Sequence, residues 1–422
     1  MSLSENPSVP RTRRCSTVDG TAIEIFLALK DAPRAKRGYP YVCTERTQQK
    51  IEETRMKFHT KIAGLVATVT LITTPAHAQS AVTLYGVVDT GVAFVNGVGA
   101  SRSSVAFMPN LSGTVPSRWG LRGTEDLGAG NKALFWLESG FAPDTGVANQ
   151  GGRIFGRQAL VGISGQWGQA AVGRQYTMLF WAMAEPDMLG PNIFGSGSFD
   201  TYLPNARADN ALSYKGTFGG VTIGATYSFG RDSVNAGPSP AGTNCAGESP
   251  ADKSACREWS VLLKYDTSSW SIGAAYDSQR GGAGAFGGLT RSDLKDDRLS
   301  INGYFMLGQA KIGGGWLRRN NEGSPTPISD LYYLGTSFPI TPAFSVDAEG
   351  FHQRFHDSAN KAWMFAARGT YAFSRRTSVY ATAGYIDNRG NLTLSVNAGQ
   401  AGTNTNAGGN QLGAMVGMKH IF

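Results

Sequence analysis

Basic side chains on strand-like segments are the groups in this sequence best placed to do chemistry. In SRWGLRGTE, Arg118 and Arg122 share one face of an extended strand, whereas Trp119 and Leu121 share the other. The other basic residues on or beside such segments are Arg157, Arg207 and Lys215. Like charges that cluster must stay hydrated, and a hydrated group of cations is accessible to anions. The pattern therefore indicates anion attraction.

Residues that would support catalysis or metal binding are sparse. His352 and His356 are four residues apart, and in a strand that spacing separates them by about 13 Å, too far to share one ion. The G-x-G-x-x-G at 282–287 stands in a loop with no βαβ pattern around it, so it does not predict a dinucleotide site. No serine-nucleophile signature lies near a histidine of residues 79–422. We therefore expect no bound metal, no cofactor and no enzymatic activity.

The positive charge of the chain is unevenly distributed. The 422 residues carry a formal charge of +8, but residues 1–78 hold 12 Lys+Arg and 7 Asp+Glu. This leaves 27 basic and 24 acidic residues for 79–422, a net charge of only +3. Basic runs with interleaved aromatic residues do not occur, so we expect no nucleic-acid partner.

A secretory signal begins at Met56 (MKFHTKIAGLVATVTLITTPAHAQS). Lys57 and Lys61 form its charged region, residues 62–73 its apolar region, and residues 76–78 its A-x-A cleavage site. We expect 56–78 to be a cleaved signal peptide and 79–422 to be the mature protein. Residues 1–55 differ from everything that follows, and we interpret them as an unstructured extension of the gene model. The alternative, a cytoplasmic domain anchored by 62–73, fails because twelve apolar residues are too few to span a membrane.

The mature region reads as a series of strands separated by Gly, Asn, Asp and Ser turns. Sixteen segments of alternating polarity run from Val82–Val95 to Gln411–Phe422. Alternation alone fits a soluble sandwich as well as a membrane barrel whose polar faces line water. The export signal favours the barrel, and so do the loops, which alternate between short ones such as 268–269 and long ones such as 176–209 and 387–410.

The last strand supports the same interpretation. In GAMVGMKHIF, Phe422 shares a face with Met418 and Val416, and the chain ends on this aromatic residue. A strand that ends on an aromatic residue suits the interfacial girdle of an outer-membrane barrel, and pairing of the last strand with the first would leave no open edge. On this reading Arg118 and Arg122 face the lumen, because arginines that face mid-membrane lipid cost about 2–4 kcal/mol each.

At this level of detail the sequence resembles the general porins of beta-proteobacteria, of the Burkholderia, Bordetella and Neisseria type. The similar segments, in family order, are SAVTLYGVVDTGV, SRWGLRGTEDLGAGNKALFWLESGF, RIFGRQALVGISGQWGQAAVGRQY, ARADNALSYKGTFGGVTIGATYSF and VGMKHIF. The resemblance covers 79–422 and implies a sixteen-stranded antiparallel transmembrane barrel in the outer membrane, a homotrimer, and passive diffusion of small hydrophilic solutes. A substrate-specific channel remains the alternative.

The resemblance also implies a constriction. The third long loop would fold into the lumen, with arginines matching Arg118, Arg157 and Arg207 forming a positive wall; Arg122 and Lys215 match less closely. Acids of the loop would face that wall, and those available are Glu185, Asp187 and Asp200. This arrangement predicts a preference for anions.

Two of the four cysteines, Cys245 and Cys256, lie close together in one long loop of an exported region. Because the periplasm is oxidising, we expect a disulfide between them, with two free thiols as the alternative.

Overall fold

The computed structural model describes residues 81–111, 113–232, 245–397, 400 and 402–422. The expected extension (1–55) and signal peptide (56–78) lie outside the described residues. Apart from four short helical turns, the regular elements are strands. They are β1 (Ala81–Val98), β2 (Ser103–Phe107), β3 (Arg118–Gly128), β4 (Asn131–Gly140), α2 (Asn149–Gly152), β5 (Gln158–Gly165), β6 (Gly168–Tyr176), α3 (Met178–Met183), η1 (Ser196–Ser198), η2 (Leu203–Asn205), β7 (Arg207–Phe218), β8 (Val221–Ser228), β9 (Glu258–Asp266), β10 (Trp270–Arg280), β11 (Lys295–Leu307), β12 (Ala310–Asn321), β13 (Ile328–Pro339), β14 (Phe344–Phe355), β15 (Lys361–Ala372), β16 (Thr377–Arg389) and β17 (Asn410–Ile421).

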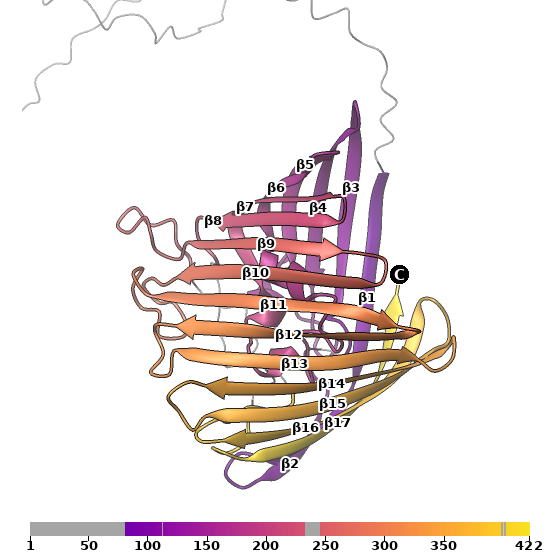
Figure 1. Ribbon diagram of the computed structural model, residues 1–422, viewed down its shortest axis with the longest axis vertical. Coiled ribbons are helices and arrows are strands. Elements are labelled where there is room, and N and C mark those ends of the chain that lie inside the picture. The colour runs from indigo at the N-terminus through magenta and orange to yellow at the C-terminus, as the bar shows by residue number, and fades with distance from the viewer. Residues whose placement is uncertain (1–80, 112, 233–244, 398–399, 401) are drawn as a thin grey trace, which may run out of the picture. The chain divides into compact units, whose positions relative to one another are not determined.

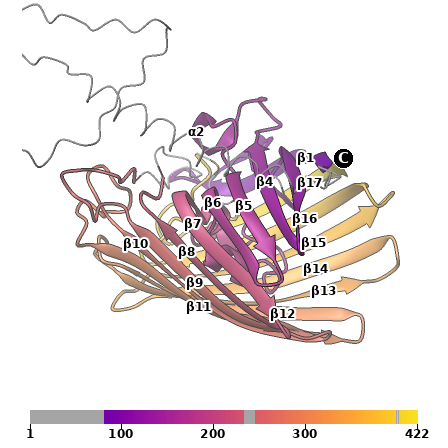
Figure 2. The same ribbon diagram turned by 90° about the horizontal axis from the view of Figure 1, so that it is seen from above.

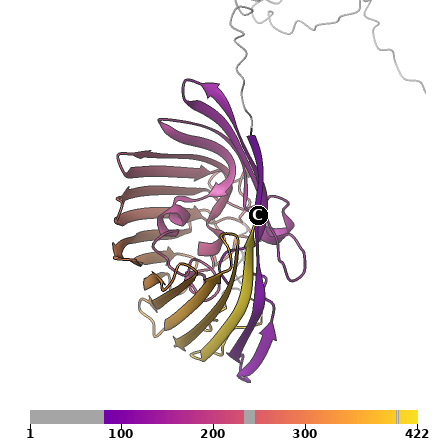
Figure 3. The same cartoon turned by 90° about the vertical axis from the view of Figure 1, so that its right-hand side faces the viewer.

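The strands form one closed antiparallel barrel. Each strand from β3 to β16 pairs with the next in the chain, and β1 pairs with β17 on one side and with β3 on the other (Figures 1 and 3). The short β2 pairs only with the loop end of β1, so the wall itself has sixteen strands within the described residues. The predicted sixteen-stranded barrel is confirmed.

The two faces of the wall follow the alternation in the sequence. In β8 exposed and buried residues alternate without a break, and Val221, Ile223 and Tyr227 point outward. In β17, Leu412, Val416 and Met418 are likewise exposed on the outer surface. The outer surface is therefore apolar and the inner face polar, as a membrane barrel requires.

The barrel closes at Phe422. Its backbone N–H donates to the Gly86 carbonyl at 3.0 Å, and its carbonyl accepts from the Gly86 N–H at 3.1 Å. A Cβ atom at Gly86 would collide with the Phe422 ring, so the glycine gives this ring its place on the first strand. The pairing of Phe422 with Gly86 thus continues the register of β1 and β17, which joins Val87 to Ile421 and Val95 to Gly413.

Loop lengths differ between the two ends of the barrel. At one end the strands join through tight turns, such as 219–220 and 308–309, in which glycines adopt positive φ angles. At the other end the connections are long, and the longest described one, residues 177–206, lies inside the barrel (Figure 2). Long loops lie on the extracellular side of barrels of this kind. Among the described residues, no helix is long and apolar enough to cross a membrane.

The structure contains a disulfide between Cys245 and Cys256, with Cα atoms 5.1 Å apart. It packs against Ala255 and Ala285.

Candidate functional site: an infolded loop against a basic wall

We call residues 177–206, which connect β6 to β7, the infolded loop. It begins as α3, which packs on the inner faces of β8 to β11. The Met178 N–H donates to Ser260 Oγ at 2.7 Å, and a Cβ atom at Gly224 would collide with the Met178 sulfur. A glycine on the inner face of β8 therefore makes room for the start of the loop.

The loop then crosses to the far side of the barrel. The Leu189 N–H donates to Glu349 Oε2 of β14 at 2.8 Å, and the Phe194 N–H donates to the Val396 carbonyl at 2.7 Å. The Phe194 ring fills the space above Gly384 of β16 and Gly413 of β17. The loop is thus attached to both sides of the lumen and narrows it.

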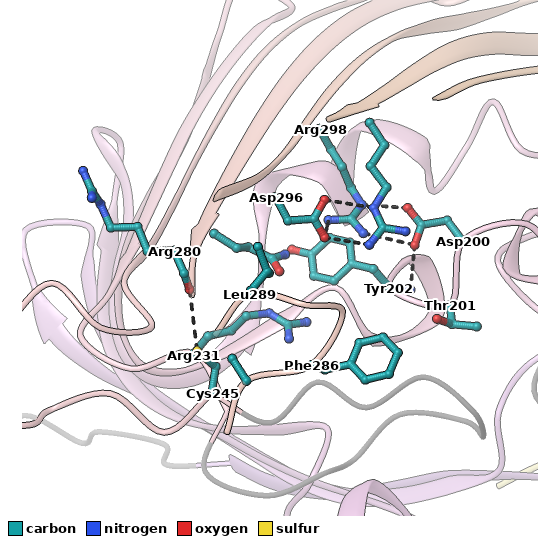
Figure 4. A pocket seen from close by; sticks show the side chains of 13 residues that line it. Asp200, Thr201, Tyr202, Arg231, Cys245, Arg280, Phe286, Leu289, Asp296 and Arg298 are labelled. Carbon is teal, nitrogen blue, oxygen red and sulfur yellow. Dashed lines mark hydrogen bonds and ion pairs between the residues drawn. The ribbon is translucent and has the colours of Figure 1, made fainter. Parts of the chain in front are cut away.

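Two of the three loop acids anchor the loop to the barrel or to itself. Asp200 accepts from Arg298 of β11 at 2.7 and 3.1 Å, with both side chains buried (Figure 4). Burial opposes ionisation of Asp200, but the charge of Arg298 outweighs it and lowers the pKa of the carboxyl group. Asp187 accepts from Ser196 Oγ at 2.6 Å and from the Gly190 N–H at 2.8 Å, also buried.

The expectation that all three acids face the basic wall is therefore wrong for Asp187 and Asp200. Only Glu185 is substantially exposed, and it pairs at 2.8 Å with Lys264 of β9 rather than with an arginine. A chain segment that crosses a lumen must satisfy its polar groups locally, and these two buried carboxylates do so.

Two of the predicted basic residues, Arg118 and Arg157, are organised around one carboxylate. Glu138 of β4 pairs with Arg157 at 2.7 Å and with Arg118 at 3.4 Å, and it accepts from the Tyr85 hydroxyl at 2.8 Å. Tyr176 continues the network, because its hydroxyl accepts from Arg157 at 2.5 Å.

Arg207 completes this network from the first residue of β7. It donates to the Tyr176 hydroxyl at 3.0 Å, and its guanidinium lies 4.5 Å from the centre of the Tyr176 ring. The ring of Phe180, from the infolded loop, stacks on Tyr176 with centroids 3.8 Å apart. Arg157 and Arg207 are consequently only 4% and 2% exposed.

The basic wall that faces water therefore differs from the expected trio. Arg118 keeps 27% of its side chain exposed, and Arg122 is exposed, with its guanidinium 5.3 Å from the Tyr85 ring centre. Lys215 is partly exposed and lies 3.5 Å from the Trp181 ring centre. We call Arg118, Arg122 and Lys215 the exposed basic wall. Arg157 and Arg207 are buried against Tyr176 of β6, on which Phe180 of the infolded loop stacks.

Glu138 was not among the residues predicted from the sequence. In the segment ALFWLESG, alternation places Glu138 on the same face as Trp136, the face that lines the lumen. Alternation could therefore have placed Glu138 in the lumen. It could not have shown its partners, because strand pairing alone brings Arg157 and Arg118 to Glu138.

Replacement of this carboxylate should shift selectivity and stability together. In Glu138→Gln, Arg157 loses its buried counterion, which should cost about 3 kcal/mol of stability, and the lumen gains a positive charge. We expect a lower unfolding temperature and a stronger preference for anions, measured by thermal unfolding and by reversal potential. Glu125→Gln, at an exposed site near the β3–β4 turn, is the matched control and should change neither. An unchanged reversal potential in Glu138→Gln would contradict the assignment.

Within the described ranges, no group of three or more His, Cys, Asp or Glu side chains could hold a metal ion. His352 and His356 make separate contacts. His352 stacks on Trp363, with ring centroids 3.8 Å apart, and His356 Nε2 lies 2.7 Å from Asp330 Oδ2.

Comparison with known proteins gives a consistent result. The family model for Gram-negative porins matches residues 64–391. Outer membrane porin protein 32 of Delftia acidovorans is 30% identical over 366 residues, 82% of this chain and 95% of that protein. An outer membrane porin of Bordetella pertussis is 28% identical over 356 residues, 74% of this chain and 90% of that protein. Among solved structures, the anion-selective porin from Comamonas acidovorans is similar with a TM-score of 0.66 and 27% identity, covering 82% of this chain and all of that one.

Proposed function

The chain belongs to the Gram-negative porin family and is an outer-membrane channel, and we propose that its pore admits small hydrophilic solutes with a preference for anions. The observation that carries this proposal is the asymmetry of the narrowed lumen. Arg118 and Arg122 present charge to the water, whereas the loop acids Asp187 and Asp200 are buried in other contacts. The similar porin described as anion-selective supports the same direction.

Selectivity of this kind arises from electrostatics without a binding pocket. Low-dielectric walls focus the field of the exposed basic wall into the water path, so anions are concentrated there and cations are depleted. Glu138 compensates only part of this charge, since it is shared by two arginines. Because salt screens the field, the preference should weaken as ionic strength rises. Diffusion itself requires no conformational step and no energy source.

The direct test is a recording from the purified protein in a planar bilayer under a KCl gradient. We expect a reversal potential of anion-selective sign that declines towards zero near 1 M salt, where the Debye length is about 3 Å. Conductance should rise with solute concentration without saturation, as in a diffusion pore. A reversal potential of cation-selective sign would refute the preference, and saturation by one solute would favour a substrate-specific channel.

We further propose that the channel is a homotrimer, as the family resemblance implies. In the same recordings each insertion should then close in three equal steps. Single-step closure, together with a monomer mass in mild detergent, would contradict the trimer without affecting the selectivity result.

A further inference from the structure

The outer surface of the barrel carries a row of charged side chains at its loop end. The row crosses five neighbouring strands, β12 to β16, and each member is the direct cross-strand partner of the next. In order, its members are Arg318, Asp330, Arg354, Lys361 and Arg389. Further along the same outward faces lie apolar side chains such as Leu334 and Phe365, which are 66% and 61% exposed. This cationic row therefore stands at the edge of the lipid-facing surface, outside the pore.

The row has more positive than negative charge. Asp330 is fully buried beneath its neighbours, with Arg318 at 2.8 Å and Arg354 at 3.6 Å. Arg389 pairs at 2.9 Å with Asp387, the residue two positions earlier on the same face. Four cations thus face two acids, and the arginines keep 42%, 52% and 61% of their side chains exposed. A surplus of outward cations beside lipid requires anions from the membrane or the medium.

Aromatic rings form a second row next to the first. Trp316, Tyr332, His352 and Trp363 are consecutive cross-strand partners. The Arg318 guanidinium lies 5.2 Å from the Trp316 ring centre, and His352 stacks between Tyr332 and Trp363. Such rings are typical of the boundary between headgroups and acyl chains, so the cationic row lies at headgroup level.

An apolar groove lies directly below the aromatic row. Small residues, including Ala348, Gly350, Ala367 and Ala383, form its floor, and larger side chains, including Leu334, Phe365, Tyr385 and Leu412, border it. Along β15 the order from the loop end inward is Lys361, Trp363, Phe365 and Ala367, which is charge, aromatic ring and then groove. An amphiphile with an anionic head and acyl chains matches this order.

We propose that this surface binds a phosphorylated glycolipid of the outer leaflet, with its phosphates on the cationic row and an acyl chain in the groove. Four interstrand steps of about 4.8 Å spread the row over roughly 19 Å, so the headgroup must carry more than one phosphate. The long-loop end is extracellular, which selects the outer leaflet. A second copy of the chain fits poorly, because two such rows would bring arginines against arginines.

The test compares lipid binding by two charge-matched double variants of the full-length mature protein, refolded without lipid. In Arg354→Gln/Lys361→Gln the row loses two cations; in Arg375→Gln/Arg376→Gln two exposed arginines are lost from a turn at the opposite end of the barrel. Binding is measured with fluorescent lipopolysaccharide. We expect the row variant to bind roughly tenfold or more weakly than the wild type and the control variant to bind like the wild type.

Three further arms make the result decisive. Dephosphorylated lipopolysaccharide should bind the wild type as weakly as intact lipopolysaccharide binds the row variant. Ala367→Phe, which fills the groove and leaves the row intact, should also weaken binding, so the proposal remains testable if the row variant fails to fold.

Equal affinity in the row variant and the control, or phosphatidylglycerol binding as tight as lipopolysaccharide binding, would overturn the proposal. The proposal would also be overturned if variants lost lipopolysaccharide binding only when their oligomer mass changed as well. Pore selectivity should not change, which separates this result from the proposed channel function.

Discussion

In a variant carrying Arg118→Ser and Arg122→Ser, the reversal potential in a KCl gradient should move strongly towards the cation-selective side. The two side chains supply the exposed guanidinium charges of the basic wall, and their loss leaves Glu138 with only buried cations beside it. One exposed charge contributes about 1 kcal/mol at close approach in water, so the anion-to-cation permeability ratio should fall by roughly tenfold at low salt. Conductance should increase modestly because the lumen widens.

The matched control removes two exposed cations from the outer loops, with Lys253→Ser and Arg291→Ser. This variant should keep the wild-type reversal potential, because its charges lie outside the narrowed lumen. If both double variants behave alike, selectivity arises from the overall charge of the protein and not from the basic wall. Arg157→Ser is a different experiment: since Arg157 is buried against Glu138, we expect its loss to reduce stability first.

The second large effect should come from the anchor of the infolded loop. In Asp200→Asn, the buried Arg298 loses its bidentate partner and keeps only Asp296, at 3.1 Å. Removal of one member of a buried ion pair costs about 3–5 kcal/mol. That cost should partly release the return segment of the loop from the wall. We expect higher and noisier single-channel conductance, together with protease cleavage within 177–206 that the wild type resists.

Asp293→Asn is the control, because it makes the same change in a fully exposed ion pair with Arg291. Exposed pairs contribute little, so its conductance and protease resistance should match the wild type. Wild-type behaviour in Asp200→Asn would show that the other loop contacts, such as those of Phe194, suffice to hold the loop.

The sequence predicted the barrel well because the barrel depends on local alternation. Strand β8 and the final strand could be assigned to faces residue by residue, and the terminal Phe422 indicated closure. Strand ends were harder to predict: Arg207 is the first residue of β7, whereas Arg157 lies one residue before β5. Such boundaries depend on pairing with neighbours, which a single strand pattern does not contain.

The site was harder to predict because burial inside a lumen is non-local. Alternation shows that an arginine points inward, but not whether another segment covers it. Arg207 is buried because Tyr176 and Phe180 stack in front of it, and Phe180 comes from the infolded loop. Likewise, Asp200 resembles any loop acid until β11 brings Arg298 to it.

The contacts of Phe194 have a consequence for how the protein is assembled. Its ring rests on glycines of β16 and β17, which are synthesised long after the loop that carries it. The far end of the infolded loop therefore cannot reach its final position until the last strands are in place, and contacts so distant in sequence are slow to form. In a barrel still open between its first and last strands, β8 to β14 could hold the rest of the loop, but its Phe194 end would have no support. Constriction and closure thus depend on the same last strands, and a fully narrowed channel is itself a sign that the cylinder has been sealed.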